Sequence, residues 1–297
     1  MSRVPLADAP VSPTGDAGAG VNQPGAGLED KHRALRRLLD GIPSLIVAYS
    51  GGVDSAFLAH IASDVLGSRV LCVTADSPSY PDRHRRMALD LAGRFGFHHE
   101  IIHTAELERP EYRANPANRC YYCKHELYSH LTAIARERSI AVIADGSNAD
   151  DRGDYRPGRQ AAREFGVRSP LDDVGLTKDE IRELSRRAGL PTWDEPASAC
   201  LSSRIPYFSE VTDEKLRTIE RAEEILRDLG FRICRVRHHD TIARIELGRD
   251  EMPRALEAEM AATIDRELRA LGYQHVVVDL RGYRLGSLND ALRLRPV

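Results

Sequence analysis

The stretch Ser50-Gly51-Gly52-Val53-Asp54-Ser55 decides the fold of this chain. It follows an apolar run, 45–49, that predicts a buried strand, and it precedes a run, 56–61, that predicts a helix. The glycine pair lets the backbone turn sharply between them. The free N–H groups of the first helical turn and the hydroxyls of Ser50 and Ser55 then face one concavity, where the helix dipole favours negative charge. The stretch therefore predicts a phosphate or pyrophosphate site.

No lysine follows the glycines, so the motif is not a Walker A loop. The hexapeptide instead resembles the signature of the PP-loop ATP pyrophosphatases, the superfamily of tRNA thiolases, NAD synthetase, GMP synthetase and asparagine synthetase. This resemblance implies that ATP is cleaved between its α- and β-phosphates, that a carboxylate or carbonyl oxygen is adenylated, and that a nucleophile then displaces AMP. It assigns ATP to Ser50, Gly51, Gly52, Asp54 and Ser55, with a catalytic role for Asp54.

The composition is that of an ordinary soluble protein of 297 residues, enough for one large or two moderate domains. Forty-two Lys and Arg against 45 Asp and Glu leave a net charge of −3, so no overall basic field attracts nucleic acid. No apolar stretch approaches the length of a membrane span, and we expect a cytoplasmic protein without a membrane partner. Five cysteines without a signal peptide argue against a disulfide framework and raise the question of metal or catalytic roles.

The order of the apolar runs predicts an α/β fold followed by a small α+β domain. Residues 1–27 are rich in Pro, Gly, Ala and Ser and predict a disordered tail. In the expected PP-loop domain, 28–207, a parallel sheet carries helices on both faces, with strands at 45–49, 70–75, 100–104, 140–144 and 167–171 and helices at 28–42, 53–66, 81–95 and 121–136. In the expected substrate or oligomerisation domain, 208–297, the order is a helix at 213–229, strands at 233–237 and 243–247, a helix at 252–271 and a strand at 276–280.

Three polar turns, 50–55, 76–79 and 145–151, fall at the carboxyl ends of expected strands, where such sheets bind ligands. In the superfamily that the hexapeptide resembles, the turn matching Asp76 lies near the nucleoside. The turn that matches Asn148, Asp150 and Asp151 lies near the reacting phosphate. The resemblance therefore assigns these four residues to ATP and Mg²⁺.

A capping box is expected where Thr177 and Glu180 precede an apolar run, and Lys178 between them needs only a structural role.

Three of the five cysteines are candidates for chemistry. Cys120 and Cys123 form a Cys-x-x-Cys pair at the expected start of a helix, which can be a redox pair, half of a zinc site, part of an iron–sulfur site or two unligated thiols. A closed zinc site needs four ligands, and the chain has no second such pair. Cys200 lies in a polar, proline-bounded loop whose donors and charge favour its thiolate. Cys72 and Cys234 lie in apolar runs and are expected to be inert.

The run 193–207, Trp-Asp-Glu-Pro-Ala-Ser-Ala-Cys-Leu-Ser-Ser-Arg-Ile-Pro-Tyr, resembles the LarE family of sulfur transferases, and the resemblance extends over about residues 30–290. It implies that ATP adenylates a carboxylate of pyridinium-3,5-biscarboxylic acid mononucleotide, which becomes a thiocarboxylate during biosynthesis of the nickel-pincer nucleotide cofactor. The family has two versions. In one, the cysteine matching Cys200 gives up its own sulfur. In the other, cysteines matching Cys120, Cys123 and Cys200 hold a 4Fe–4S cluster whose open iron binds sulfide, and because all three are present we favour this version.

The same resemblance assigns the substrate phosphate to Arg235 and Arg237, which alternate along an expected strand and so share one side of it. From spacing alone, a solvated strand face is an equal alternative. Glu223 and Glu246 are expected beside that phosphate, and Arg204 joins Cys200 and Asp54 as an expected catalytic residue. The implied partners are a nucleotide-like carboxylate, sulfide or another sulfur donor, nickel-inserting and carboxylating enzymes of the pathway, and further copies of the chain.

Two other functions stay open at this point. A tRNA thiolase uses almost the same chemistry, but it would need a basic surface and an RNA-reading module, and the chain has no basic block or zinc-ribbon pairs. A module that senses ATP or AMP without chemistry would release no pyrophosphate and would be indifferent to Cys200→Ala.

Overall fold

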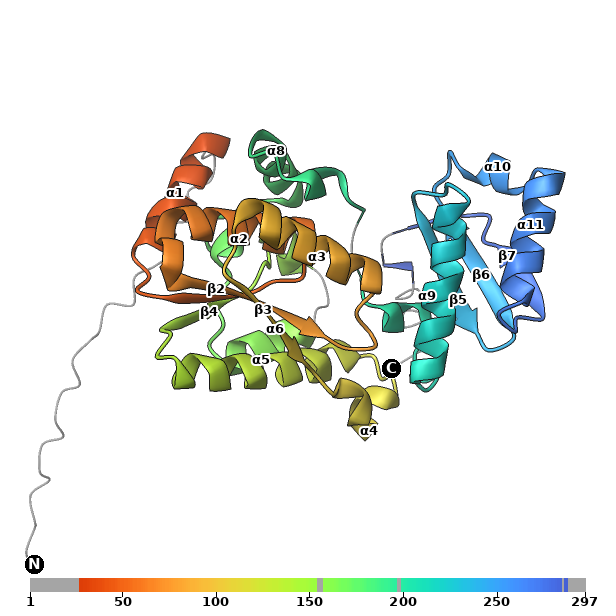
Figure 1. Ribbon diagram of the computed structural model, residues 1–297, viewed down its shortest axis with the longest axis horizontal. Coiled ribbons are helices and arrows are strands. Elements are labelled where there is room, and N and C mark those ends of the chain that lie inside the picture. The colour runs from red at the N-terminus through yellow and green to blue at the C-terminus, as the bar shows by residue number, and fades with distance from the viewer. Residues whose placement is uncertain (1–26, 154–156, 197–198, 285, 288–297) are drawn as a thin grey trace, which may run out of the picture.

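The computed structural model describes residues 27–153, 157–196, 199–284 and 286–287, and all but the last residue of the expected tail 1–27 lies outside these ranges. The chain forms two lobes, an α/β lobe at the N-terminal side and a smaller lobe at the C-terminal side (Figure 1). The expected α/β fold with a second α+β unit is thereby confirmed.

The sheet of the first lobe has four parallel strands in the order β3-β2-β1-β4 within the described residues. Leu45 at the start of the central strand pairs with Val70 on one side and Val142 on the other. The strands are short, and the central pair β1 and β2 is mostly apolar and buried, as a parallel sheet covered on both faces requires, whereas the edge strand β3 is half-buried. They span β1 (Leu45–Ala48), β2 (Val70–Asp76), β3 (His99–His103) and β4 (Val142–Ala144).

Helices cover both faces of this sheet, α1, α2, α3 and α8 on one and α5 and α6 on the other (Figure 1). Alternate residues of β1 serve the two faces, since Leu45 and Val47 belong to one apolar cluster and Ile46 and Ala48 to the other. The helices and helical turns of the lobe are α1 (Leu28–Asp40), α2 (Val53–Leu66), η1 (Gly67–Arg69), α3 (Asp82–Phe95), η2 (Glu106–Glu108), α4 (Pro110–Arg113), α5 (Arg119–Glu137), η3 (Ala149–Gly153), α6 (Pro157–Glu164), α7 (Pro170–Asp173), α8 (Lys178–Arg187), η4 (Pro191–Asp194) and η5 (Leu201–Arg204).

The strand expected at 167–171 is wrong. Arg168 makes only an isolated parallel bridge with Ala144, and the chain then enters α7 at Pro170. Proline has no N–H for a sheet, and its fixed φ suits the first residue of a helix, so the apolar run ends in a helix instead.

The second lobe follows the expected order of elements. Its sheet has the order β5-β6-β7, in which β5 and β6 are antiparallel and β6 and β7 parallel. The helix expected at 252–271 is two helices, because Glu257 is extended between them. The elements are α9 (Asp213–Asp228), β5 (Cys234–His239), β6 (Ile242–Leu247), α10 (Met252–Ala255), α11 (Ala258–Arg269) and β7 (His275–Val278).

A separate apolar cluster joins the two lobes. It contains Tyr112, Leu201 and Ile205 from the first lobe and Leu216 and Ile219 from α9. The domain boundary near residue 207 stays a prediction, and this cluster packs residues from both sides of that position together.

Among the helices that the structure describes, none combines the length and apolar character needed to cross a membrane.

Candidate active site

The loop between β1 and α2 is held in a closed turn by its own serines. Ser55 Oγ accepts the N–H of Ser50 at 3.1 Å and lies 3.1 Å from Ser50 Oγ. Gly51 has φ of +64°, and Gly52 begins α2 without a side-chain cap. Because no side chain caps this helix, its first N–H groups face the loop, as an anion site requires.

Gly51 cannot take a side chain without moving the loop. A Cβ there would lie 2.8 Å from Ala88 Cβ and 3.0 Å from Ala88 Cα, and the positive φ adds strain. We expect Gly51→Ala to raise the KM for ATP by about tenfold or more and to destabilise the protein by about 1–3 kcal/mol. Pyrophosphate release at varied ATP and urea unfolding measure both effects. Gly93→Ala is the matched control, since a Cβ there meets nothing within 4 Å inside α3 and alanine favours a helix.

Lys178 connects the loop to the turn that follows β4. Its ammonium group pairs with Asp54 Oδ2, and its backbone N–H donates to Asp150 Oδ2 at 2.8 Å. The capping box of Thr177 and Glu180 is confirmed, and Lys178 between them also pairs with Asp54, a contact that was not predicted from the sequence. One signal in the sequence could have found this residue, because a cation in the first turn of a helix opposes the helix dipole and needs an anion nearby.

The turn 145–151 lies directly against the loop. A Cβ on Gly146 would lie 2.9 Å from the Ser55 nitrogen, so only glycine allows this approach. Asn148 and Asp151 are buried and shape the turn: Asn148 Oδ1 accepts the N–H of Asp150, and Asp151 Oδ2 accepts the N–H of Asn148, each at 3.1 Å. The expected ATP residues of the first and third polar turns are therefore brought together.

Asp76 ends β2 at the same edge of the sheet, and its Oδ2 lies 3.5 Å from Nη1 of Arg85 in α3.

Two hydrogen bonds join the loop to the segment of Cys200. Tyr80 donates its hydroxyl to the Ser50 carbonyl at 2.9 Å, and the N–H of Leu201 donates to the Ser79 carbonyl at 2.8 Å. Residues 79 and 80 are neighbours in the chain, so the loop 50–55 and the Cys200 segment both contact one short stretch. Tyr80 was not identified from the sequence.

The Cys200 segment is also fastened to the start of α5. Tyr112 and Ser202 share a hydrogen bond of 2.7 Å, and Arg119 donates to the Ser202 carbonyl at 3.1 Å. Asn115 donates to the Pro206 carbonyl at 2.7 Å. These contacts connect residues that are about 90 positions apart in the sequence.

The three candidate cysteines lie close enough for their charges to influence one another. Cys120 is exposed and Cys123 and Cys200 are half-buried. Desolvation raises the pKa of Cys123, and the charges of Glu106 and Cys200 raise it further. Desolvation also raises the pKa of Cys120, where Arg119 opposes the effect and Cys200 adds to it. Within the described ranges, no three His, Cys, Asp or Glu side chains are arranged as the ligands of a metal ion. Cys72 and Cys234 are buried, as expected.

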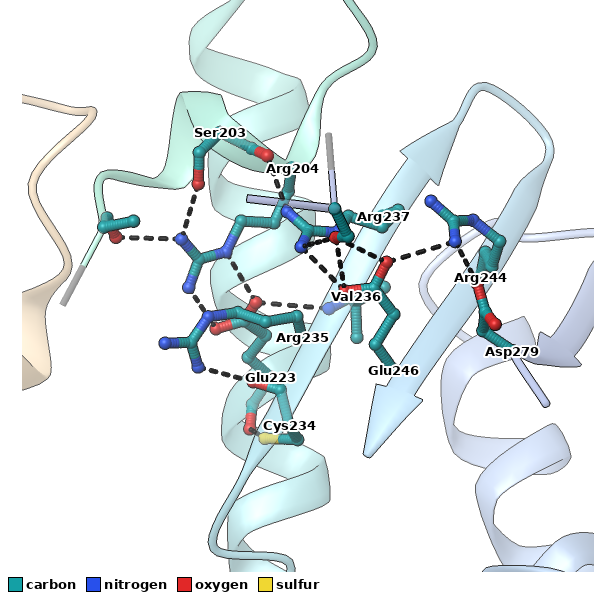
Figure 2. A network of polar contacts seen from close by, with 12 residues as sticks. Ser203, Arg204, Glu223, Cys234, Arg235, Val236, Arg237, Arg244, Glu246 and Asp279 are labelled. Carbon is teal, nitrogen blue, oxygen red and sulfur yellow. Dashed lines mark hydrogen bonds and ion pairs between the residues drawn. The ribbon is translucent and has the colours of Figure 1, made fainter. Parts of the chain in front are cut away.

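Arg204 and Glu223 form a buried ion pair (Figure 2). The two side chains are each 1 % exposed, and Arg204 Nε and Nη2 donate to the two carboxylate oxygens at 2.8 and 3.0 Å. The remaining nitrogen, Nη1, donates to the carbonyls of Ala199 and Cys200 and to Ser203 Oγ. This arginine thereby sets the path of the backbone on both sides of the cysteine.

Arg235 and Arg237 are buried on β5 (Figure 2). Arg237 donates to Glu246 at 2.7 Å, to Ser287 Oγ at 2.8 Å and to the Ser203 carbonyl at 2.7 Å, while its Nε is buried without a partner among the described residues. Arg235 lies 5.2 Å from the centre of the Tyr283 ring, and burial followed by the charge of Arg204 lowers its pKa. The lowered pKa mainly reflects burial of the guanidinium, and the positive charge of Arg204 adds to it.

Several known proteins are similar to this chain, although no family model matches it. An uncharacterised protein of Synechocystis is 43 % identical over 89 % of this chain and 99 % of its own length. Pyridinium-3,5-bisthiocarboxylic acid mononucleotide synthase of Lactiplantibacillus plantarum is 36 % identical over 90 % of this chain and 96 % of its own length. One of the subunits of the glutamine-hydrolysing GMP synthase of Methanopyrus kandleri is 27 % identical over 68 % of each chain.

The similarity to the Synechocystis and L. plantarum proteins extends over both lobes. The similarity to the GMP synthase subunit covers about two thirds of this chain. The chain therefore belongs to the LarE family, and it is an ATP-dependent enzyme of the PP-loop ATP pyrophosphatase superfamily.

Proposed function

We propose that this enzyme converts a carboxylate of pyridinium-3,5-biscarboxylic acid mononucleotide into a thiocarboxylate at the expense of ATP, in the biosynthesis of a nickel-pincer nucleotide. One observation carries the proposal: hydrogen bonds from Tyr80 to Ser50 and from Leu201 to Ser79 place the ATP loop next to the segment of Cys200. The name of the L. plantarum relative supplies the substrate class.

The loop activates the carboxylate. A carboxylate oxygen attacks the α-phosphorus of ATP, the bond to the β-phosphate oxygen breaks, and the N–H groups of α2 hold the departing pyrophosphate. The ammonium group of Lys178, which pairs with Asp54 in the structure, turns to the pyrophosphate and compensates the negative charge of that group. Asp54 Oδ1 is buried without a hydrogen-bond partner among the described residues, and such an oxygen suits Mg²⁺. Asn148, Asp150 and Asp151, on the turn 145–151, are assigned to the reacting phosphate or Mg²⁺, and Asp76 is assigned to the nucleoside.

A sulfide sulfur then attacks the acyl carbon, and AMP leaves with the former carboxylate oxygen. The thiols of Cys120, Cys123 and Cys200 are suited by type and proximity to a 4Fe–4S cluster, which when bound would supply an open iron for sulfide. Each thiolate of a cluster binds a different iron, so the three need not approach as closely as the ligands of a single ion, which lie about 3.8 Å apart around zinc. The three thiols therefore need not be arranged as the ligands of one metal ion in order to hold a cluster.

The substrate phosphate is assigned to Arg235 and Arg237, two buried cations of β5, and Arg237 Nε is buried without a partner among the described residues. Glu223 and Glu246 hold the arginines of this network in place. Arg204 acts as a positioning residue for the Cys200 backbone, because all three of its nitrogens already have partners inside the protein.

Product analysis tests the proposal. The full-length chain, prepared without oxygen, is incubated with ATP, Mg²⁺, sodium sulfide and the biscarboxylic acid mononucleotide, and the products are followed by mass spectrometry. We expect a thiocarboxylate, with one AMP and one pyrophosphate for each sulfur transferred. Absence of AMP and pyrophosphate with this substrate would contradict the proposal.

Three further arms separate the alternatives. If product forms once per chain without added sulfide and Cys200 loses the elements of H₂S, the sacrificial version holds. Thiolation of tRNA, together with salt-sensitive tRNA binding, would favour a tRNA thiolase. Nucleotide binding without any pyrophosphate release would favour a sensor module.

A further inference from the structure

Glu106, the first residue of η2, is a buried carboxylate whose partners are hydroxyl groups. The residue is 2 % exposed, and its Oε1 accepts the hydroxyls of Ser77 and Ser79 at 2.5 and 2.7 Å. Among the residues that the structure describes, no cation lies within ion-pair distance of this carboxylate. The other two buried glutamates of the described ranges, Glu223 and Glu246, each pair with an arginine. A buried charge without a counter-ion is unfavourable, so the two serines are what holds Glu106 in place.

The two serines belong to one compact turn, 77–80. Its backbone is closed by the N–H of Tyr80, which donates to the Ser77 carbonyl at 2.9 Å, and the hydroxyls of Ser77 and Ser79 lie 3.0 Å apart. A buried polar network in which each member has a partner fixes one arrangement of the groups that it joins. Glu106 therefore fixes the conformation of this turn through both of its serine side chains.

The turn 77–80 is the stretch that contacts both parts of the candidate active site. Tyr80 donates its hydroxyl to the carbonyl of Ser50 in the ATP loop, and the Ser79 carbonyl accepts the N–H of Leu201, the residue after Cys200. A shift of the turn would therefore move the ATP loop and the Cys200 segment relative to each other.

The element that carries Glu106 is itself packed beside the cysteines. Leu107, the next residue of η2, packs against the apolar cluster that joins the two lobes. Leu201 belongs to this cluster, and Cys123 packs against it. The carboxylate is thus attached to a fixed part of the structure, as a residue that positions others has to be.

We propose that Glu106 is a positioning residue that keeps the adenylated carboxylate at the ATP loop aligned with the sulfur delivered at the Cys200 segment. This rests on the proposed function, in which the two steps share one site. Glu106 acts through the turn 77–80 and not on the reacting atoms. Such alignment matters because a misplacement of about 1 Å can lower the rate of a reaction about 100-fold.

Loss of the alignment has a chemical signature. When sulfur does not reach the acyl carbon, water attacks that carbon instead, the bond between the acyl carbon and the AMP oxygen breaks, and both protons of the water pass to solvent. The original carboxylate and AMP are released, so ATP is consumed without sulfur transfer. The ratio of pyrophosphate formed to sulfur transferred therefore measures the alignment, and it does not depend on the fraction of the enzyme that is folded.

Substitution of Glu106 should change this ratio in the sulfur-transfer assay. We expect about one in the wild type and about five or more in Glu106→Ala, because sulfur transfer falls more than pyrophosphate release. Glu106→Gln should recover part of the loss, since its amide oxygen accepts hydrogen bonds from the same hydroxyls without the charge. A ratio of one in Glu106→Ala would overturn the proposal.

Glu126→Gln is the matched control. Glu126 lies on α5 beside the same helical turn, where it accepts the N–H of Ala105 at 3.5 Å and pairs with Arg109 at 3.7 Å. Its printed contacts do not include the turn 77–80, so the ratio should stay at one.

Hydrogen exchange tests the same hold on the chain without ATP, substrate or sulfide. In Glu106→Ala, the N–H of Leu201, which the Ser79 carbonyl accepts at 2.8 Å, should exchange about tenfold faster or more than in the wild type. The N–H of Ile181 in α8, which donates to the Thr177 carbonyl, should exchange at the wild-type rate. If Glu106→Ala does not fold, Ser79→Ala removes one of the two hydroxyls and should give a smaller increase at Leu201.

The two measurements separate this proposal from the proposed function. Unchanged exchange at Leu201 in these variants, with sulfur transfer intact, would overturn the role of Glu106 alone. Faster exchange at Leu201 together with a wild type that forms no thiocarboxylate would refute the proposed function, while the hold of Glu106 on the Cys200 segment would stand.

Discussion

Replacing Cys200 with alanine is expected to abolish thiocarboxylate formation, by about 10³-fold or more. The reason holds for both versions of the chemistry, because Cys200 is either a ligand of the cluster that holds sulfide or the sulfur donor itself. Pyrophosphate should still form as the carboxylate is adenylated, since Ser50–Ser55 and Lys178 are untouched. Mass spectrometry of the nucleotide product and a pyrophosphate assay on the same samples measure the two steps.

Cys72→Ala is the matched control for this experiment. Cys72 is buried in β2 and belongs to the apolar core of the first lobe, so its removal should leave sulfur transfer intact. Sulfur transfer at the wild-type rate in Cys200→Ala would refute the role of this cysteine and would favour a different sulfur site.

Replacing Glu223 with glutamine is expected to lower the free energy of unfolding by about 3–5 kcal/mol, because it leaves Arg204 buried without its anion. Urea unfolding measures this difference. Glu183→Gln is a suitable control, since Glu183 pairs with Arg186 and Arg187 at the surface and its loss should change the unfolding midpoint little. An equally small effect of Glu223→Gln would show that the buried pair contributes no net stability.

The same pair makes the stability of the protein sensitive to acid. Burial alone raises the pKa of Glu223, but Arg204, Arg235 and Arg227 outweigh it and lower the pKa from 4.5 to about 2. Because the folded pKa is depressed, the stabilisation is complete above pH 4.5 and is lost as the pH falls toward 2. The difference in stability between wild type and Glu223→Gln should therefore narrow over that interval, and a difference independent of pH would contradict this account.

Local patterns were enough to predict most of the fold. The continuous apolar run of β1 predicts a strand buried on both faces, and its alternate residues do enter two different cores. The wrong prediction of a strand at 167–171 also has a local cause, because Pro170 begins a helix where the apolar character of the run alone suggested a strand. Breaks such as Glu257, where one long helical pattern becomes two helices, depend on a single residue's backbone conformation and are not visible in the pattern.

The candidate site was predictable only in its local parts. The hexapeptide and the turn at 145–151 carry their own motifs, whereas the pairing of Lys178 with Asp54 joins residues 124 positions apart. The approach of Cys200 to Cys120 and Cys123 also depends on tertiary contacts, among them those of Tyr112 and Asn115. Charge type alone cannot distinguish an arginine that contacts substrate from one that, like Arg204, is held in a buried ion pair.

The most direct test of the central claim, that three cysteines beside the ATP loop hold a cluster that receives sulfide, is iron and acid-labile sulfide analysis after anaerobic preparation. The wild type should contain about four of each per chain, Cys123→Ala should lose the cluster, and Cys234→Ala should keep it, because Cys234 is buried in β5 and its thiol contacts the Glu223 carbonyl. If the wild type binds no iron even after anaerobic reconstitution, the cluster is refuted, and Cys200 is left as a sacrificial donor whose loss of H₂S the mass of the protein would reveal.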